Sequence, residues 1–162
     1  MPSVTTLPSP PPEAVKQKES TAELLERLSS AIGVVINEHD FDFTSDSAKE
    51  LIAHIAPDMK SQLDTCAQDA NHLTWEEQVS QWRQRAKYTP DVRFHLDQIA
   101  SDVNEDTGRA TVFMEMTVHG IENVTLQAMN DLKWRRKNGQ WMLYHMIGLR
   151  GSTANTGFVP PG

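Results

Sequence analysis

A glutamate and a histidine, Glu115 and His119, are the residues best suited to acid/base chemistry in the segment FMEMTVHG. Apolar residues alternate with them, as is typical of a strand, so both side chains share one face. Side chains four residues apart on a strand are separated by about 13 Å, at roughly 3.3 Å per residue. Such a pair can take a proton from one end of a fused-ring ligand and return one to the other end, as isomerisation, dehydration and cyclisation require.

The next alternating segment, VTLQAMNDLKWRR, extends this polar face. Pairing across the GIEN turn places Gln127, Met129 and Asp131 beside Glu115 and His119. Two interpretations of the row stay open. It is either the solvated face that antiparallel sheets ordinarily show, or the wall of a cavity that makes polar contacts with a ligand.

Three helices are expected to cover one face of the sheet that holds this row. Apolar residues recur at helical spacing over residues 20–37, 47–56 and 74–88. Each segment begins with a hydroxyl residue followed three positions later by a glutamate, the pattern of a capping box. The three pairs are Ser20 and Glu23, Ser47 and Glu50, and Thr74 and Glu77.

The second half of the chain predicts a four-stranded antiparallel meander. Its segments DVRFHLDQIASDV, RATVFMEMTVHG, VTLQAMNDLKWRR and QWMLYHMIGLRG alternate and are separated by turns. The Asn138-Gly139 pair is the strongest hairpin signal, because a tight primed turn needs positive φ at both central positions. A further strand is expected in MKSQLDTC. The order of elements predicts an α+β fold, with three N-terminal helices on a strongly curved, mostly antiparallel sheet.

The length of 162 residues suits one folded domain with a single core. Residues 1–19 are rich in proline, serine and threonine and are expected to form a disordered tail. The folded domain is expected over residues 20–151, followed by a flexible C-terminal tail at 152–162.

The composition of the chain argues against several classes of binding partner. The net charge of −7 argues against nucleic acid, because a phosphate backbone is bound by clustered Lys and Arg. No apolar run is long enough to cross a membrane or to form a signal-peptide core, so no membrane partner and a cytoplasmic location are expected. The single cysteine, Cys66, allows no intrachain disulfide and offers no metal-ligand spacing, so no metal or other cofactor is expected.

The order of elements over residues 20–151, the bridge HIAPDM and the hairpin LKWRRKNGQWMLYHMIGLRG resemble the nuclear-transport-factor-two-like superfamily. This superfamily includes SnoaL-like polyketide cyclases, ketosteroid isomerases and scytalone dehydratase. The resemblance implies a cone-shaped fold with a deep pocket between the concave sheet and the helices. It also implies cofactor-free acid/base catalysis and a dimer through the other face of the sheet.

The resemblance implies roles for particular residues. His39 and Asp40 match a Tyr-Asp step of scytalone dehydratase-like proteins, with histidine in place of tyrosine. Asp131 stands where an asparagine is usual, and His95 falls about two residues from its ungapped position. The expected catalytic residues are Asp40, His95, Glu115, His119 and Asp131, and the expected substrate-binding residues are His39, Trp75, Trp82, Phe113, Gln127 and Met129.

Each of these residues also has a structural alternative. Asp40 can cap the loop after the first helix, and His95 and His119 can be solvated strand residues. Tryptophans at the spacing of Trp75 and Trp82 are more often core residues than ligand platforms.

The expected function is therefore a cofactor-free isomerase or lyase, a dehydratase or cyclase, acting on a small hydrophobic substrate. The substrate class is polyketide- or terpenoid-like, as in secondary metabolite biosynthesis. The alternative is a non-catalytic ligand-binding or dimeric adaptor module of the same fold. A homodimer is expected through an apolar sheet face formed by Met114, Met116, Leu132 and Trp134.

Overall fold

The computed structural model describes residues 18–64 and 72–153. Most of the two expected tails and Cys66 lie outside the described residues. The elements in chain order are α2 (Thr21–Glu38), α3 (Asp46–Ala53), β1 (Ile55–Asp64), α4 (Trp75–Tyr88), β2 (Arg93–Asn104), β3 (Arg109–Ile121), β4 (Val124–Lys137) and β5 (Gln140–Thr153).

The first and third predicted helices begin where the sequence indicates. The Ser20 hydroxyl accepts the backbone N–H of Glu23, whose carboxylate accepts the N–H of Ser20. Thr74 and Glu77 make the same reciprocal pair at the start of α4. Both capping boxes are confirmed, because each satisfies backbone donors that the first helical turn leaves without an intrahelical partner.

The start of α3 differs from the prediction. Ser45, not Ser47, is the N-cap, and its hydroxyl accepts the N–H of Ala48 at 3.2 Å. The expected partner of Ser47, Glu50, instead accepts a hydrogen bond from Arg27 on α2. A contact between two helices therefore replaces the local capping box that the sequence pattern predicts.

The strands form one sheet in the order β1-β5-β4-β3-β2. The four C-terminal strands make the predicted antiparallel meander, and β1 lies parallel to β5 at one edge. Asn138 and Gly139 connect β4 and β5 with φ angles of 54° and 80°, which confirms the predicted turn. The α+β class and the mostly antiparallel sheet are confirmed.

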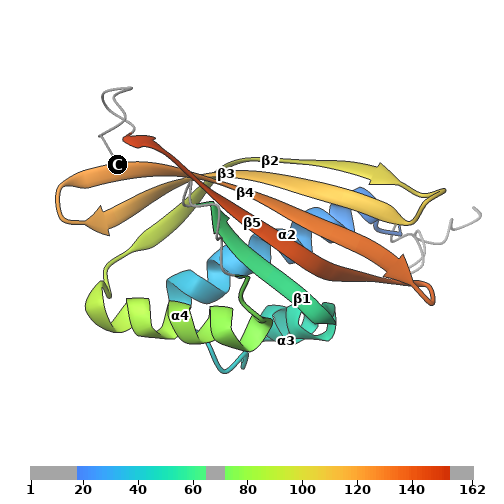
Figure 1. Cartoon of the computed structure of the whole chain (residues 1–162), viewed down its shortest axis with the longest axis horizontal. Coiled ribbons are helices and arrows are strands. Elements are labelled where there is room, and N and C mark those ends of the chain that lie inside the picture. Colours follow the sequence, from blue (N-terminus) through green and yellow to red (C-terminus); the bar gives the residue numbers. More distant parts are fainter. Residues whose placement is uncertain (1–17, 65–71, 154–162) are drawn as a thin grey trace, which may run out of the picture.

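The three helices gather on one side of the sheet (Figure 1). They cover the face that carries Val112 and Met114, which are 0% and 4% exposed. Burial of this apolar face, together with the apolar stripes of α2 and α4, forms a single core. Each Å² of apolar surface that this core removes from water contributes about 25 cal/mol to stability.

The prediction of which residues form a homodimer surface is wrong. Met114, Met116, Leu132 and Trp134 are all buried within the chain. They leave no apolar patch that a second copy must cover. The expectation of a homodimer loses this basis and stays a prediction.

Candidate functional site

The polar row of β3 and β4 lies on the sheet face opposite to the helices. The predicted register is confirmed, since Glu115 pairs with Met129 and Phe113 pairs with Asp131. Glu115, His119 and Gln127 are exposed, and Asp131 is half-buried.

The prediction that this row lines a cavity between sheet and helices is therefore wrong. The amphipathic helices gain free energy by covering the apolar face of the strands, which leaves the polar face to water. Glu115, His119 and Asp131 thus do not converge with Asp40 on one enclosed volume. Their catalytic roles stay a prediction.

The other predicted residues of β2 to β4 share this outer face. His95 is exposed, and its Nε2 lies 3.7 Å from an Asp97 carboxylate oxygen. Phe113 and Met129 are 44% and 43% exposed, which is high for residues expected to bind an apolar ligand in a pocket. They form a mixed surface with Gln127 and not an enclosed site.

Asp40 holds the loop between α2 and α3. Its carboxylate accepts the backbone N–H and hydroxyl of Thr44 at 2.9 and 2.8 Å and the backbone N–H of Ser45 at 3.1 Å. The hydrogen bonds from the Thr44 and Ser45 backbones lower the pKa of Asp40 to about 2. A carboxylate with a lowered pKa is a weak base, so Asp40 holds the loop after α2, as the structural alternative for this residue proposes. It also positions Ser45, the N-cap of α3, by accepting the Ser45 backbone N–H.

The hydrogen bonds of Asp40 should make the stability of the fold depend on pH in the acid range. The pKa of Asp40 falls from 3.8 to about 2 on folding, so its contribution is complete above about pH 4 and is lost as the pH falls toward 2. The melting temperature of Asp40→Ala should therefore lie below that of the wild type at pH 7, and the two should approach each other between pH 4 and pH 2. Thermal unfolding of both proteins across this range measures the gap, and a gap of constant width would contradict the assignment.

His39, Trp75 and Trp82 also have structural positions. His39 ends α2 with a φ of 55°, and its ring stacks on Phe41 at a centroid distance of 5.9 Å. Trp75 and Trp82 are each 7% exposed and meet edge to face at 5.7 Å in the core. Trp82 is a core residue, whereas Trp75 also borders a pocket.

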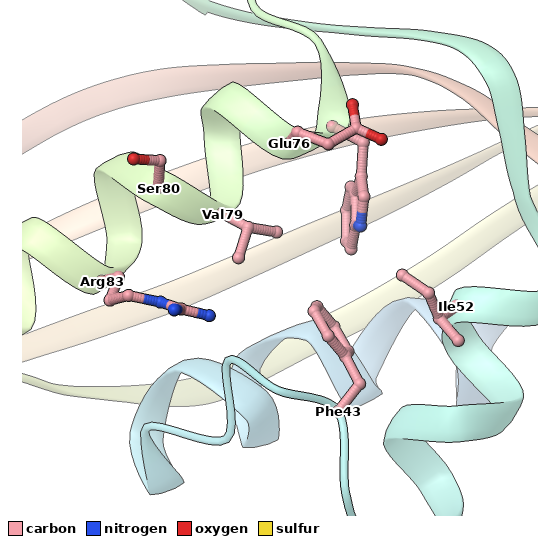
Figure 2. A pocket seen from close by; sticks show the side chains of 7 residues that line it. Phe43, Ile52, Glu76, Val79, Ser80 and Arg83 are labelled. Atoms are coloured by element: carbon pink, nitrogen blue, oxygen red, sulfur yellow. The ribbon is translucent and has the colours of Figure 1, made fainter.

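That pocket lies on the helical side of the molecule and has a volume of about 440 Å³. Figure 2 shows side chains of α4 facing side chains from the loop before α3 and from α3 itself across the hollow. Of the residues expected from the sequence, Trp75 alone lines it. Its lining residues are Phe43, Ile52, Trp75, Glu76, Val79, Ser80 and Arg83.

The polar side of the pocket comes from one face of α4. Glu76, Ser80 and Arg83 follow each other at intervals of four and three residues, so they line up along the helix. Arg83 Nη2 donates to the carbonyl oxygen of Phe41 at 2.8 Å and to Asp42 Oδ1 at 3.1 Å. Arg83 thereby connects α4 to the loop that carries Phe43.

The sequence contained only a weak signal for this site. A glutamate, a serine and an arginine at helical spacing beside an apolar stripe ordinarily indicate a solvated helix face. Nothing in the local pattern shows that Phe43 and Ile52, from another part of the chain, lie across from them.

Some classes of site find no support in the described residues. Within the described residues, 18–64 and 72–153, no three His, Cys, Asp or Glu side chains lie close enough together to hold a metal ion. None of the helices described is long and apolar enough to cross a membrane.

No protein-family model and no curated protein matches this sequence. Solved structures, in contrast, share its fold. An NTF2-like protein of unknown function from Pseudomonas putida KT2440 is 16% identical, with a TM-score of 0.63 over 88% of this chain and 96% of that chain.

Two further similar structures carry enzyme names. The hexachlorocyclohexane dehydrochlorinase LinA-type3 from Novosphingobium barchaimii LL02 is 12% identical, with a TM-score of 0.62 over 85% of this chain and 92% of that chain. A candidate scytalone dehydratase from Novosphingobium aromaticivorans DSM 12444 is 12% identical, with a TM-score of 0.58 over 81% of this chain and 84% of that chain. These similarities confirm the nuclear-transport-factor-two-like fold that the order of elements predicts.

Proposed function

We propose that the pocket between α4, α3 and the loop before α3 binds a small, largely apolar organic molecule. The observation that carries the proposal is the convergence of Phe43, Ile52, Trp75 and Val79, from three segments of the chain, on one hollow. Ile52 is 37% exposed there, and a bound apolar group would remove it from water. A volume of about 440 Å³ lies within the usual range for small-molecule sites.

The polar groups of the pocket would orient the molecule. Glu76 and Arg83 are seven residues apart on α4, which places them roughly 10 Å apart along the helix at 1.5 Å per residue. Ser80 lies between them, so the apolar body of a ligand can lie against Val79 while its polar ends meet these side chains. Few polar groups on an apolar wall are typical of sites that fix the orientation of a ligand.

Filling the hollow should weaken binding. Ile52→Trp places a large side chain in the pocket, while Val34→Trp adds the same side chain at an exposed position of α2 that does not line it. In calorimetric titration with 2-naphthol as the probe, we expect the wild type and Val34→Trp to bind alike and Ile52→Trp to bind at least about tenfold more weakly, the equivalent of ~1.4 kcal/mol. Equal binding by all three proteins would place the ligand elsewhere.

A second candidate is acid/base catalysis on a molecule bound in the same pocket. The similar structures named as a dehydrochlorinase and a candidate dehydratase favour it. The reaction would be a dehydration, isomerisation or cyclisation of a polyketide- or terpenoid-like compound of secondary metabolism. Among the lining residues, Glu76 carries the only carboxylate and would serve as the proton acceptor.

One variant, Glu76→Gln, distinguishes the two candidate functions. Glu76→Gln should leave binding of an apolar probe intact under both. Under the catalytic candidate it should also abolish the new products that mass spectrometry detects when the wild type is incubated with an extract of the producing organism. Products that persist with Glu76→Gln would exclude Glu76 as the proton acceptor.

A further inference from the structure

The outer face of the sheet carries a row of basic side chains at its β1 edge. Lys60 on β1 pairs with His145 on β5, and His145 pairs with Lys133 on β4. Paired residues point to the same face, and neighbouring strands lie about 4.8 Å apart, so the Cα atoms of the three residues fall within roughly 10 Å. His72, just before α4, adds a fourth, with its ring centroid 6.1 Å from that of His145.

The charges around this row do not neutralise it. On the same face, Arg135 is the next basic group along β4, and Asp58 already pairs with it at 2.5 Å. Arg135 and Arg109 also lie over the Tyr144 ring, at 5.1 and 5.3 Å from its centroid.

Glu77, at the start of α4, accepts the N–H of Thr74, which lowers the pKa of its carboxylate, and it lies near enough to Lys60 for that ammonium group to help lower this pKa. The other carboxylates near the row belong to other positions in the ladder. Asp131 is two residues from Lys133 but pairs with Ile147 and Phe113, and Asp102 is separated from Lys133 by the paired Thr111. Among the described residues, no carboxylate lies within ion-pairing distance, 4.0 Å, of Lys60 or Lys133.

This arrangement is unfavourable without a counter-ion. Lys60 and Lys133 lie on either side of His145, so protonation of His145 would place like charges directly opposite each other, which destabilises a sheet. Burial, followed by the nearby His72 and Lys133, lowers the pKa of His145. The formal charge of the whole chain is −7, but at physiological ionic strength charges more than about 8 Å away are largely screened. Among the described residues, the two lysines of the row therefore face the single nearby carboxylate of Glu77, which leaves the row positive.

We propose that His72, His145, Lys60 and Lys133 bind a phosphate dianion on the outer face of the sheet. Two ammonium groups and two imidazole N–H groups supply donors on one side of a tetrahedral anion, and charge-assisted bonds of this kind are the stronger ones in proteins. The phosphate is either the free ion or the group of a small phosphomonoester. This site is separate from the helical pocket and does not depend on the function proposed there.

Imidazole proton resonances of the full chain measure this binding. At constant ionic strength, we expect inorganic phosphate to shift the His72 and His145 signals saturably and to raise the pKa of His145, because a bound dianion favours the imidazolium form. Lys133→Gln should weaken binding about tenfold, as the loss of one charge-assisted bond predicts. The matched control is Lys137→Gln, at the exposed end of the same strand, which should bind like the wild type.

Phenyl phosphate titrated in parallel separates the two sources. Tighter binding of phenyl phosphate assigns a phosphomonoester, and binding of inorganic phosphate at least as tightly assigns the free ion; both results support a phosphate site. The proposal is overturned if neither compound gives a saturable shift, if sodium chloride at the same ionic strength gives the same shift, or if Lys133→Gln binds like Lys137→Gln. Lys60→Gln provides a second test should Lys133→Gln fail to fold.

Discussion

Replacing Trp134 with alanine lowers the free energy of unfolding by about 3–5 kcal/mol, the usual cost of removing a large aromatic side chain from a core. Trp134 is 0% exposed and lies on the helix-covered face of β4. Its indole Nε1 donates a hydrogen bond to the Ser29 hydroxyl of α2 at 3.2 Å. The side chain therefore joins the central sheet to the longest helix by packing and by a buried polar contact.

Urea unfolding followed by circular dichroism measures this loss of free energy. One further variant isolates the share of the hydrogen bond, and another serves as a control. Ser29→Ala removes only the acceptor of the indole N–H and should cost about 1–3 kcal/mol, the price of a buried unsatisfied donor. Tyr88→Ala removes an aromatic side chain that is 78% exposed and should stay within about 0.5 kcal/mol of the wild type. A loss below about 1 kcal/mol for Trp134→Ala would show that helix α2 does not pack on β4 as the structure has it.

Gly120→Ala is expected to destabilise the chain by about 2–5 kcal/mol, which combines a positive φ with steric overlap. Gly120 has a φ of 95°, and a Cβ built there would lie 2.2 Å from the carbonyl oxygen of Asp91 and 2.6 Å from its carbonyl carbon. The clash is with backbone, which cannot move aside as a flexible side chain can. The close approach joins the end of β3 to the segment that leads into β2.

Gly139→Ala is the matched control for this substitution. Gly139 has a similar φ of 80°, but nothing lies within 4 Å of a Cβ built on it. It should therefore show the conformational cost alone, about 1–2 kcal/mol. If the two variants lose the same free energy in urea unfolding, the contact between Gly120 and Asp91 is looser than the structure shows.

The strands and their partners could be predicted because the evidence for them is local. Alternation sets which residues of a strand share a face, and the short turns set the register of the hairpins. Alternation thus places Glu115 and Asp131 on one face, and the register of β3 with β4 agrees. The fold class followed from the order of helices and strands.

The start of α3 could not be predicted in the same way. Both Ser45 and Ser47 are acceptable caps by residue type. Asp40 accepts the N–H of Ser45, and Glu50, the expected partner of Ser47, is bound by Arg27. Contacts with α2 and with the preceding loop therefore overrode the local capping-box pattern, which favours Ser47.

The amino-acid order alone thus settled the α+β class, the capping boxes at Ser20 and Thr74, the Asn138-Gly139 turn and the two-sided character of β3. Only the tertiary structure decided that the helices cover the apolar side, that Glu115 and His119 face outward, and that the pocket lies among the helices. The physical reason is that hydrogen bonds of turns and strand alternation act between near neighbours, whereas burial is a property of the whole chain. Phe43, Ile52 and Trp75 come together because packing selects the arrangement that removes most apolar surface from water, and no local pattern contains that comparison.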